Sequence, residues 1–225
     1  FRGELLQELK AKGYEITVIC PPDEKNAHYF TDLGIKLLTV PMSRKGTNIK
    51  EDVQLVKNLF KVYKKEKFDL VFHYTIKPNI YGTLAAKLAG IKSIAITTGL
   101  GYVFLHNNIT SLIAKFMYKF SLAFANEVWF LNDDDMNIFL DKDLITERQA
   151  FKLPSEGINT KRFVPKEKNR KDSKTVFLMI ARVLYDKGFN EYLEAAKLIK
   201  AQRNDVEFQL LGAIDSGNPS GVPQS

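Results

Sequence analysis

The amino-acid sequence predicts an α/β fold in which a parallel β-sheet carries helices on both faces. Short runs rich in β-branched residues alternate with longer segments of helical period, which is typical of this class. Several of the short runs are hydrophobic almost throughout, and this indicates strands that are buried on both faces. We expect strands at residues 15–20, 35–40, 70–73, 93–97, 127–131, 150–153, 176–180 and 206–211.

Helices are expected between these strands, where apolar residues recur at helical spacing. Such stripes begin with Leu5, Val53 and Leu84, and we expect each to face the core. A doubly wound domain normally opens with a strand, whereas the first element here is a helix over residues 3–12 that leads directly into the strand 15–20. We therefore expect that the first strand of the sheet is missing.

The regular alternation stops after Pro154, where a polar, lysine-rich stretch with Pro165 follows. We interpret residues 1–154 as a first Rossmann-like domain and residues 155–174 as an interdomain linker. Residues 175–225 then form the start of a second Rossmann-like domain, which is truncated. Two strands and one helix are too few to bury a complete core.

Composition limits the possible partners. The single Cys20 excludes an internal disulfide, and the three histidines are too widely spaced for a zinc site. We expect neither a metal nor a cofactor. No apolar run is long enough to span a bilayer. The net charge of +7 favours an anionic partner, which leaves nucleic acid, a lipid surface and a phosphorylated small molecule open. No nucleic-acid-binding motif accompanies the lysine-rich stretches, so we expect no nucleic-acid partner.

Arg182, Lys187 and Gly188 form the strongest candidate site. They follow the strand 176–180 and precede a helix, and ligands of open α/β sheets bind beyond the carboxyl ends of the strands. A guanidinium, an ammonium and the N–H groups of a helix start together suit a diphosphate. Two basic residues in a loop can also be ordinary solvated charges, and the residues alone leave that alternative open.

Two motifs in this order resemble the large family of retaining GT-B glycosyltransferases. The first is the linker sequence LPSEGINTKRFVP, which matches the family at Gly157, Ile158, Asn159, Arg162, Phe163 and Pro165. The second is the turn ARVLYDKG, which matches the Gly-Arg-Leu…Lys-Gly donor motif at Arg182, Lys187 and Gly188, with Ala181 in place of the usual glycine. The resemblance implies a GT-B fold in which Arg182 and Lys187 hold the diphosphate of a nucleotide-sugar donor.

The resemblance extends over the first domain and is closest to bacterial enzymes that build capsule, O-antigen or lipid-linked glycans. It is carried there by YTIKPNIYG at residues 74–82 and TGLG at residues 98–101. These loops are expected to line the acceptor side of the cleft, with Lys77 near an acceptor phosphate and His73 positioning the acceptor or transferring a proton. The acceptor-side residues are His73, Lys77, Thr98, Gly99 and Gly101. A structural histidine, a helix that begins at Pro78 and turn glycines explain the same residues without a ligand.

Two further segments allow more than one interpretation. The aspartates at residues 133–135 follow a strand, as in the metal-binding Asp-x-Asp of the other major glycosyltransferase fold. After Asn132 they also suit the first turn of a helix, which we favour. Residues 108–125 form a basic, aromatic, amphipathic pattern. We favour packing against the core, and contact with an anionic membrane surface is the alternative.

The resemblance as a whole implies a hexosyltransferase in bacterial surface glycan synthesis. It would move a sugar, with retention, from a nucleoside diphosphate donor, UDP-linked, to a glycan or polyprenyl-diphosphate-linked acceptor. We expect a cytoplasmic location, with peripheral contact at the inner face of the membrane. No catalytic residue is assigned, because the family's two glutamates would lie beyond Ser225, and we expect the fragment as given to be inactive. Two alternatives stay open: a sugar-nucleotide epimerase of the same fold, and a non-enzymatic, basic Rossmann-like binding module.

Overall fold

The computed structural model describes residues 2–23, 27–43, 48–100, 104, 109–165, 174–215, 218 and 220–223 of the chain. The chain divides into two compact units, Phe1–Phe163 and Val164–Ser225, called unit 1 and unit 2 below. Each unit is built from parallel strands joined by helices. The division falls within the stretch that we interpret as a linker from the sequence.

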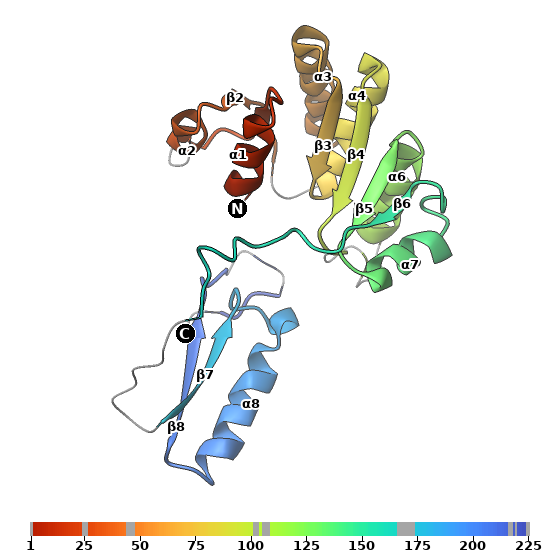
Figure 1. The fold of residues 1–225 in the computed structure, drawn as a ribbon. Helices are drawn as coiled ribbons and strands as arrows, with labels where there is room; N and C mark the ends of the chain where they lie inside the picture. Colours follow the sequence, from red (N-terminus) through yellow and green to blue (C-terminus); the bar gives the residue numbers. More distant parts are fainter. Residues whose placement is uncertain are drawn as a thin grey trace. The chain divides into compact units, whose positions relative to one another are not determined.

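Unit 1 contains two parallel sheets (Figure 1). In the first sheet, β1 (Thr17–Cys20) pairs with β2 (Lys36–Thr39), and the second has the order β3-β4-β5-β6. The strands of the second sheet are β3 (Leu70–Tyr74), β4 (Lys92–Thr97), β5 (Glu127–Phe130) and β6 (Ala150–Lys152). No strand joins the two sheets within the described part of the chain. The expectation of a missing first strand stays a prediction.

The helices of unit 1 alternate with these strands. They are α1 (Gly3–Ala11), α2 (Ala27–Asp32), α3 (Ile49–Glu66), the π-helical turn η1 (Pro78–Gly82), α4 (Thr83–Ala89), α6 (Ile109–Leu122) and α7 (Asp133–Asp141). The Asn48 side chain accepts a hydrogen bond from the Lys50 N–H at the start of α3. Asn132 does the same for Asp135 at the start of α7. Each cap satisfies a backbone N–H that a helix start leaves without an intrahelical partner.

The core of unit 1 lies between the four-stranded sheet and its helices. Because successive parallel strands are neighbours in the sheet, right-handed connections place α4, α6 and α7 on one face. One cluster of buried residues centres on Phe130, Phe139 and Leu122, and a second joins Leu55, Leu59, Tyr63, Val40, Val71, Ala85 and Ala86. Three stripe residues that we expected to face the core, Leu5, Val53 and Leu88, are exposed instead. In α3 the buried stripe runs through Asp52, Leu55, Leu59 and Tyr63, and Val53 lies beside it.

Unit 2 is a single βαβ unit. Its strands β7 (Thr175–Ile180) and β8 (Val206–Leu211) pair in parallel along their whole length, and α8 (Phe189–Lys200) connects them. A short 3₁₀ turn, η2 (Tyr185–Lys187), precedes α8. The Tyr192 hydroxyl of α8 lies within 2.9 Å of the Phe177 carbonyl and 2.8 Å of the Gln209 carbonyl, so it holds the helix to both strands. All eight strands that the sequence predicts are therefore confirmed.

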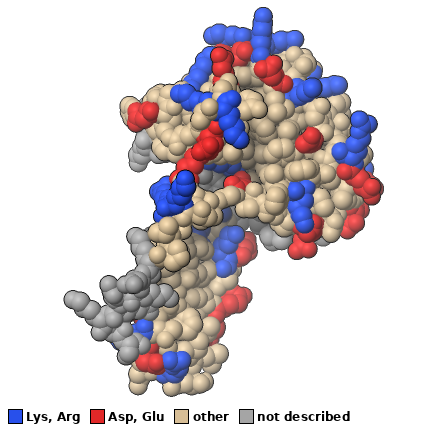
Figure 2. Space-filling model, viewed as in Figure 1, with Lys and Arg blue, Asp and Glu red and all other residues tan. Residues whose placement is uncertain are grey.

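The surface of unit 1 carries charges of both signs, with a gathering of basic side chains at one end. Figure 2 shows Lys and Arg side chains at the end of the molecule where α3 ends in Figure 1. Lys64 and Lys65 lie in the last turn of α3 and Lys67 is its C-cap. Basic residues there are favourable, because the last helical turn carries unpaired carbonyl groups and a partial negative charge. Among the described residues, no helix combines the length and the apolar character needed to cross a bilayer.

Candidate functional site

The carboxyl ends of the unit 1 strands carry most of the residues that the sequence singled out there. Ser43 lies after β2, Lys77 after β3, Thr98 after β4 and Asn132 after β5. The strands within each sheet are parallel, so their carboxyl ends meet at one edge. Open α/β sheets bind their ligands at this edge.

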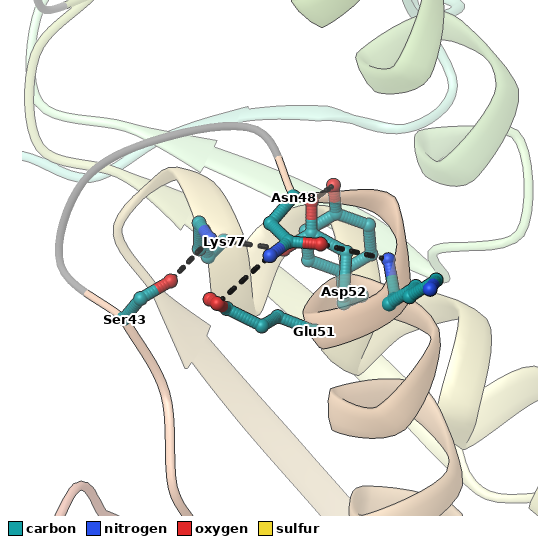
Figure 3. Close-up of polar contacts among 7 residues, drawn as sticks. Ser43, Asn48, Glu51, Asp52 and Lys77 are labelled. Carbon is teal, nitrogen blue, oxygen red and sulfur yellow. Dashed lines mark hydrogen bonds and ion pairs between the residues drawn. The ribbon is translucent and has the colours of Figure 1, made fainter.

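Lys77 is held at this edge by a buried carboxylate (Figure 3). Its ammonium donates hydrogen bonds of 2.9 Å to Asp52 Oδ1 and 2.9 Å to Ser43 Oγ. Asp52 lies in the first turn of α3, is only 7% exposed, and also accepts a 2.7 Å hydrogen bond from the Tyr81 hydroxyl. Burial of the Tyr81 phenol, together with its bond to Asp52, raises its pKa, so the hydroxyl stays a donor. Lys77 is therefore a fixed cation whose charge is balanced by a neighbouring carboxylate.

A pocket of about 200 Å³ opens beside this cluster. It is lined by Pro41, Met42, Ser43, Glu51, Asp52, Gln54, Leu55, Asn58 and Lys77. Its lining combines an ammonium, two carboxylates, two amides and a hydroxyl with apolar side chains. Such a mixture can exchange hydrogen bonds with a hydroxyl-rich molecule while apolar surface packs against its carbon atoms.

His73 lies in β3 but is buried beneath this edge. The side chain is 4% exposed, and its Nε2 lies 2.9 Å from the Tyr63 hydroxyl while its Nδ1 lies 3.2 Å from the Thr83 hydroxyl. Burial lowers the pKa of the imidazole from 6.5 to about 3, so the ring is neutral at physiological pH. Gly82 packs directly on it, since a Cβ at that glycine would lie 2.6 Å from the ring carbon Cδ2. These contacts favour the structural interpretation of His73 that the sequence left open.

The loop after β4 presents backbone to solvent. Thr98 and Gly99 are both exposed, and Gly99 has a φ of 142°, a conformation that glycine adopts far more readily than other residues. A Cβ at Gly99 would meet nothing within 4 Å, so the glycine is explained by its backbone conformation and not by crowding from the described residues. Gly101, the remaining residue predicted for the acceptor side, lies outside the described residues.

The aspartates at residues 133–135 form the first turn of α7, as the helix interpretation predicts. Asp133 pairs with Lys152 of β6 at 2.8 Å, and Asp135 accepts a hydrogen bond from the Asn132 side chain that caps the helix. A second, open pocket lies here at the carboxyl ends of β5 and β6, lined by Leu131, Asn132, Asp133, Asp134, Lys152, Leu153 and Pro154. Among the described residues, no three His, Cys, Asp or Glu side chains lie close enough together to hold a metal ion.

Unit 2 places Arg182 and Lys187 on the loop between β7 and α8, as predicted. Both side chains are exposed, and Arg182 Nη1 lies 3.1 Å from Asp215 Oδ2. Lys187 ends the turn η2, and Gly188, with a φ of 79°, is the N-cap of α8. The first N–H groups of α8 therefore lie directly after Lys187, and a helix start carries partial positive charge.

The segment after β8 fixes the position of this loop, which the sequence alone did not reveal. The Tyr185 N–H donates to the Ser220 carbonyl, and the Asp186 N–H donates to the Ser220 hydroxyl. Gly212 passes so close to β7 that a Cβ on it would lie 1.7 Å from the Ala181 carbonyl oxygen. The sequence did contain a signal for the close approach at Gly212, since a glycine at the end of a strand often marks a point where two backbones come close together.

Asp52, Tyr81 and Ser43 are further site residues that the sequence analysis missed. The signal for Asp52 is its place on a helical stripe with Leu55, Leu59 and Tyr63, because a buried aspartate needs a polar partner. Tyr81 lies within the sequence that carries the family resemblance, but nothing in its local pattern identifies Asp52 as its partner.

Residues 2–132, more than half of the chain, match the model of a family described as glycosyl transferase 4-like. The chain belongs to the glycosyl transferase 4-like family. The match covers β1 to β5 of unit 1, and with them the Lys77 cluster and the loop after β4. The candidate site residues of unit 1 therefore lie within the part of the chain that matches the family model.

Two curated relatives resemble this glycosyl transferase 4-like chain. One is the N,N'-diacetylbacillosaminyl-diphospho-undecaprenol alpha-1,3-N-acetylgalactosaminyltransferase of Campylobacter jejuni, which is 33% identical over 98% of this chain and 61% of its own length. The other is the UDP-Gal:alpha-D-GlcNAc-diphosphoundecaprenol alpha-1,3-galactosyltransferase of Escherichia coli, which is 26% identical over 85% of this chain and 51% of its own length. The chain thus spans about half to three fifths of the length of these relatives.

A solved structure shares the fold. Anabaena HepE, crystallised in complex with UDP and glucose, superposes with a TM-score of 0.70 at 17% sequence identity, over 96% of this chain and 58% of that chain. At this level of identity the likeness concerns the fold alone. The fold of this glycosyl transferase 4-like protein is of the GT-B type, with a Rossmann-like domain, as the sequence predicts.

Proposed function

We propose that the protein transfers a sugar from a UDP-linked donor to a hydroxyl of an acceptor carried on polyprenyl diphosphate, as a hexosyltransferase of bacterial surface glycan synthesis. The observation that carries this proposal is the 33% identity to the Campylobacter jejuni enzyme over 98% of this chain. The Escherichia coli relative supports it, because its name also describes sugar transfer to a diphosphoundecaprenol-linked acceptor.

In this proposal the donor diphosphate binds at the loop between β7 and α8. Arg182 and Lys187 supply two cations, and the N–H groups that follow Gly188 supply hydrogen-bond donors and the positive end of the α8 dipole. Asp215 orients the Arg182 guanidinium through the 3.1 Å ion pair. When the sugar leaves, negative charge develops on the diphosphate, and preorganised donors of this kind are worth several kcal/mol in a transition state.

We further propose that this loop is the family's donor motif and that transfer occurs with retention of anomeric configuration. Ala181, where the family usually has glycine, fits this assignment, because Gly212 provides the close approach at the same point. The corresponding domain division is an acceptor-side domain over residues 1–154, a linker over 155–174 and a donor-side domain from residue 175.

The acceptor is proposed to bind at the carboxyl edge of unit 1. Lys77 lies there with its ammonium fixed between Asp52 and Ser43, beside a pocket with several polar groups. Thr98 and Gly99 expose backbone at the neighbouring strand end, where a close approach by a ligand meets no side chain at the glycine. His73 supports this edge from below. A polyprenyl-linked acceptor lies in a membrane, so we expect the enzyme to act in peripheral contact with the membrane surface on the side of its nucleotide-sugar donor.

The test is to incubate the full-length protein with UDP-sugars, with and without a short-chain polyprenyl-diphosphate glycan. A transferase forms a glycosylated lipid only when the acceptor is present, and proton NMR of the product reports whether the configuration is retained. A new UDP-sugar formed without acceptor would instead identify an epimerase. Binding of UDP-sugars without turnover under either condition would support a binding module, and both of these outcomes reject the transferase.

We predict that Lys187→Ala in the full-length protein lowers kcat by about two orders of magnitude or more, because one preorganised cation at the diphosphate is lost. Steady-state kinetics with saturating acceptor measure the change. Lys200→Ala, which removes a cation from the last turn of α8, is the matched control and should leave kcat unchanged. Equal rates for Lys187→Ala and the wild type would reject the donor-site assignment.

A further inference from the structure

The outer face of α6 is strongly apolar although it is exposed. Leu112, Ile113, Phe116 and Phe120 are between 51% and 69% exposed. They lie on one side of the helix, since residues 112, 116 and 120 follow one another at four-residue spacing, while Tyr118 and Leu122 on the other side are buried in the core. The sequence interpretation of α6 as a core helix therefore holds for one face only.

This apolar face continues onto the end of α4. The two helices, α4 and α6 (Figure 1), are in contact. Lys87 Nζ of α4 lies 5.6 Å from the centroid of the Phe124 ring, which follows α6. Leu88, the next residue of α4, is 64% exposed. We call this the α4–α6 surface, and its exposed apolar side chains are Leu88, Leu112, Ile113, Phe116, Phe120 and Phe124. Contiguous exposed apolar patches are uncommon on soluble monomers and usually mark an interaction site.

The charge of the same segment has one sign. From Leu70 to Asn126 the sequence contains no Asp or Glu, but it contains lysines at positions 77, 87, 92, 115 and 119. Lys119 is exposed within α6, and Lys115 Nζ lies 6.0 Å from the Phe104 ring centroid. In α3, by contrast, carboxylates are interspersed with the lysines. The α4–α6 surface thus combines aromatic and aliphatic side chains with lysines and carries no carboxylate.

We propose that the α4–α6 surface docks on an anionic lipid bilayer, with its apolar side chains at the depth of the headgroups and its lysines against acidic phospholipids. Exposed Phe and Leu on one face of a helix, with Lys beside them, are the composition of helices that lie in a membrane interface. A second copy of the chain fits less well, because a symmetric contact would bring lysines against lysines without a carboxylate on either side. The proposal rests on the proposed function in one respect, because a lipid-linked acceptor gives the protein a reason to bind a membrane. Binding of the α4–α6 surface to a bilayer does not itself require sugar transfer.

The test is co-sedimentation of the full-length protein with vesicles of phosphatidylcholine, with and without phosphatidylglycerol. The wild type should bind the phosphatidylglycerol vesicles about tenfold more tightly or better, and salt should weaken this binding. Phe116→Ser/Phe120→Ser and Lys87→Gln/Lys119→Gln should each lower the affinity about tenfold. Leu198→Ser, an equally exposed apolar residue of α8, and Lys142→Gln/Lys200→Gln are the matched controls and should bind as the wild type does.

Three results would overturn the proposal: no vesicle binding by the wild type, equal binding by the α6 variants, or a dimer in solution that Phe116→Ser/Phe120→Ser dissociates. Far-UV circular dichroism and the urea midpoint check that the variants fold. Transfer to a water-soluble acceptor analogue, assayed without vesicles, should be unchanged in these variants. Variants that lose vesicle binding but keep this transfer would support the α4–α6 surface as the membrane-docking site. If the wild type shows no transfer, only the proposed function is rejected.

Discussion

His73 joins three elements of unit 1 through a buried imidazole. It lies on β3, and its two ring nitrogens meet the Tyr63 hydroxyl of α3 and the Thr83 hydroxyl of α4. A charged ring would lose its hydration in this position, which is why burial lowers its pKa to about 3. The neutral ring has hydroxyl groups as partners at both nitrogens, so we interpret it as a structural group that supports the edge where Lys77 lies.

We predict that the titration of His73 makes unit 1 less stable as the pH falls from 7 to 5. In the unfolded chain the imidazole takes up a proton near pH 6.5, whereas in the folded chain it stays neutral down to about pH 3. The unfolded state therefore gains protons in this window, and the free energy of unfolding should fall by about 2 kcal/mol between pH 7 and pH 5. Urea denaturation at several pH values measures this slope.

Two variants separate His73 from the other titrating groups. His73→Gln should flatten the slope between pH 7 and pH 5, whatever its effect on stability at pH 7. His28→Gln, which changes an exposed histidine of α2, is the matched control. If His73→Gln and the wild type have the same slope, the buried imidazole is not the source of the pH dependence.

Gly82 packs directly against the imidazole of His73. We predict that Gly82→Ala destabilises the protein by about 1–3 kcal/mol, because its Cβ would lie 2.6 Å from His73 Cδ2 and the helix and strand must move apart. The gain in helix propensity, about 1 kcal/mol, opposes this effect and sets the lower end of the range. In a His73→Ala background the penalty should vanish, and a double-mutant cycle by urea denaturation measures the coupling. Additive effects of the two changes would show that the contact is not the cause.

The sequence predicted which single residues belong to the site, but not which groups surround them. Lys77 was identified through the family resemblance, yet its partner Asp52 is twenty-five positions away on another helix. Nothing local to Lys77 determines that a carboxylate, and not solvent, meets its ammonium. For Arg182 and Lys187 the sequence also predicted the position, because their loop is defined by one strand and one helix that are neighbours in the sequence.

At the scale of the elements, the pattern of apolar residues and the residue composition predicted the strands well. A parallel strand buried on both faces leaves a continuous apolar run in the sequence, and β4 is an example, with Ser93 to Thr97 all buried. The short helix α2 was missed because six residues are too few to show a helical period. The helix that begins at Pro78 was one of the alternatives that the sequence left open, and the structure has it, but nothing in the local pattern shows that its first turn, η1, is π-helical.

The loop between β7 and α8 gives a prediction at this scale, because its position depends on Gly212. Gly212→Ala would place a Cβ 1.7 Å from the Ala181 carbonyl oxygen, so the backbone beside Arg182 must move. We expect the affinity of the full-length protein for UDP to fall about tenfold, a loss of about 1.4 kcal/mol, when measured by isothermal titration calorimetry. Ala213→Gly, one residue along, is the control and should bind UDP as the wild type does. Unchanged affinity in Gly212→Ala would mean that the close approach does not position the donor site.

At the scale of the whole molecule, the two units differ in how much core they contain. Both hydrophobic clusters found among the described residues lie in unit 1. In the described part of unit 2, only Val183, Leu184 and Val206 are buried apolar residues, and no residue of α8 is buried. The sequence predicted this imbalance, because two strands and one helix supply little apolar surface to one another.

We predict that the two units, expressed separately, differ in cooperativity. Residues 1–163 should show a sigmoidal urea transition by far-UV circular dichroism, because two buried clusters link their helices to strands. Residues 164–225 should instead lose their signal gradually, because a two-stranded sheet with one helix is marginal without further packing. The Tyr192 hydroxyl links α8 to both strands and the rings of Phe177 and Phe208 stack, so Tyr192→Phe should weaken the residual helix signal of this unit. A sharp transition for residues 164–225 that Tyr192→Phe leaves unchanged would show that β7, β8 and α8 are sufficient for a stable fold.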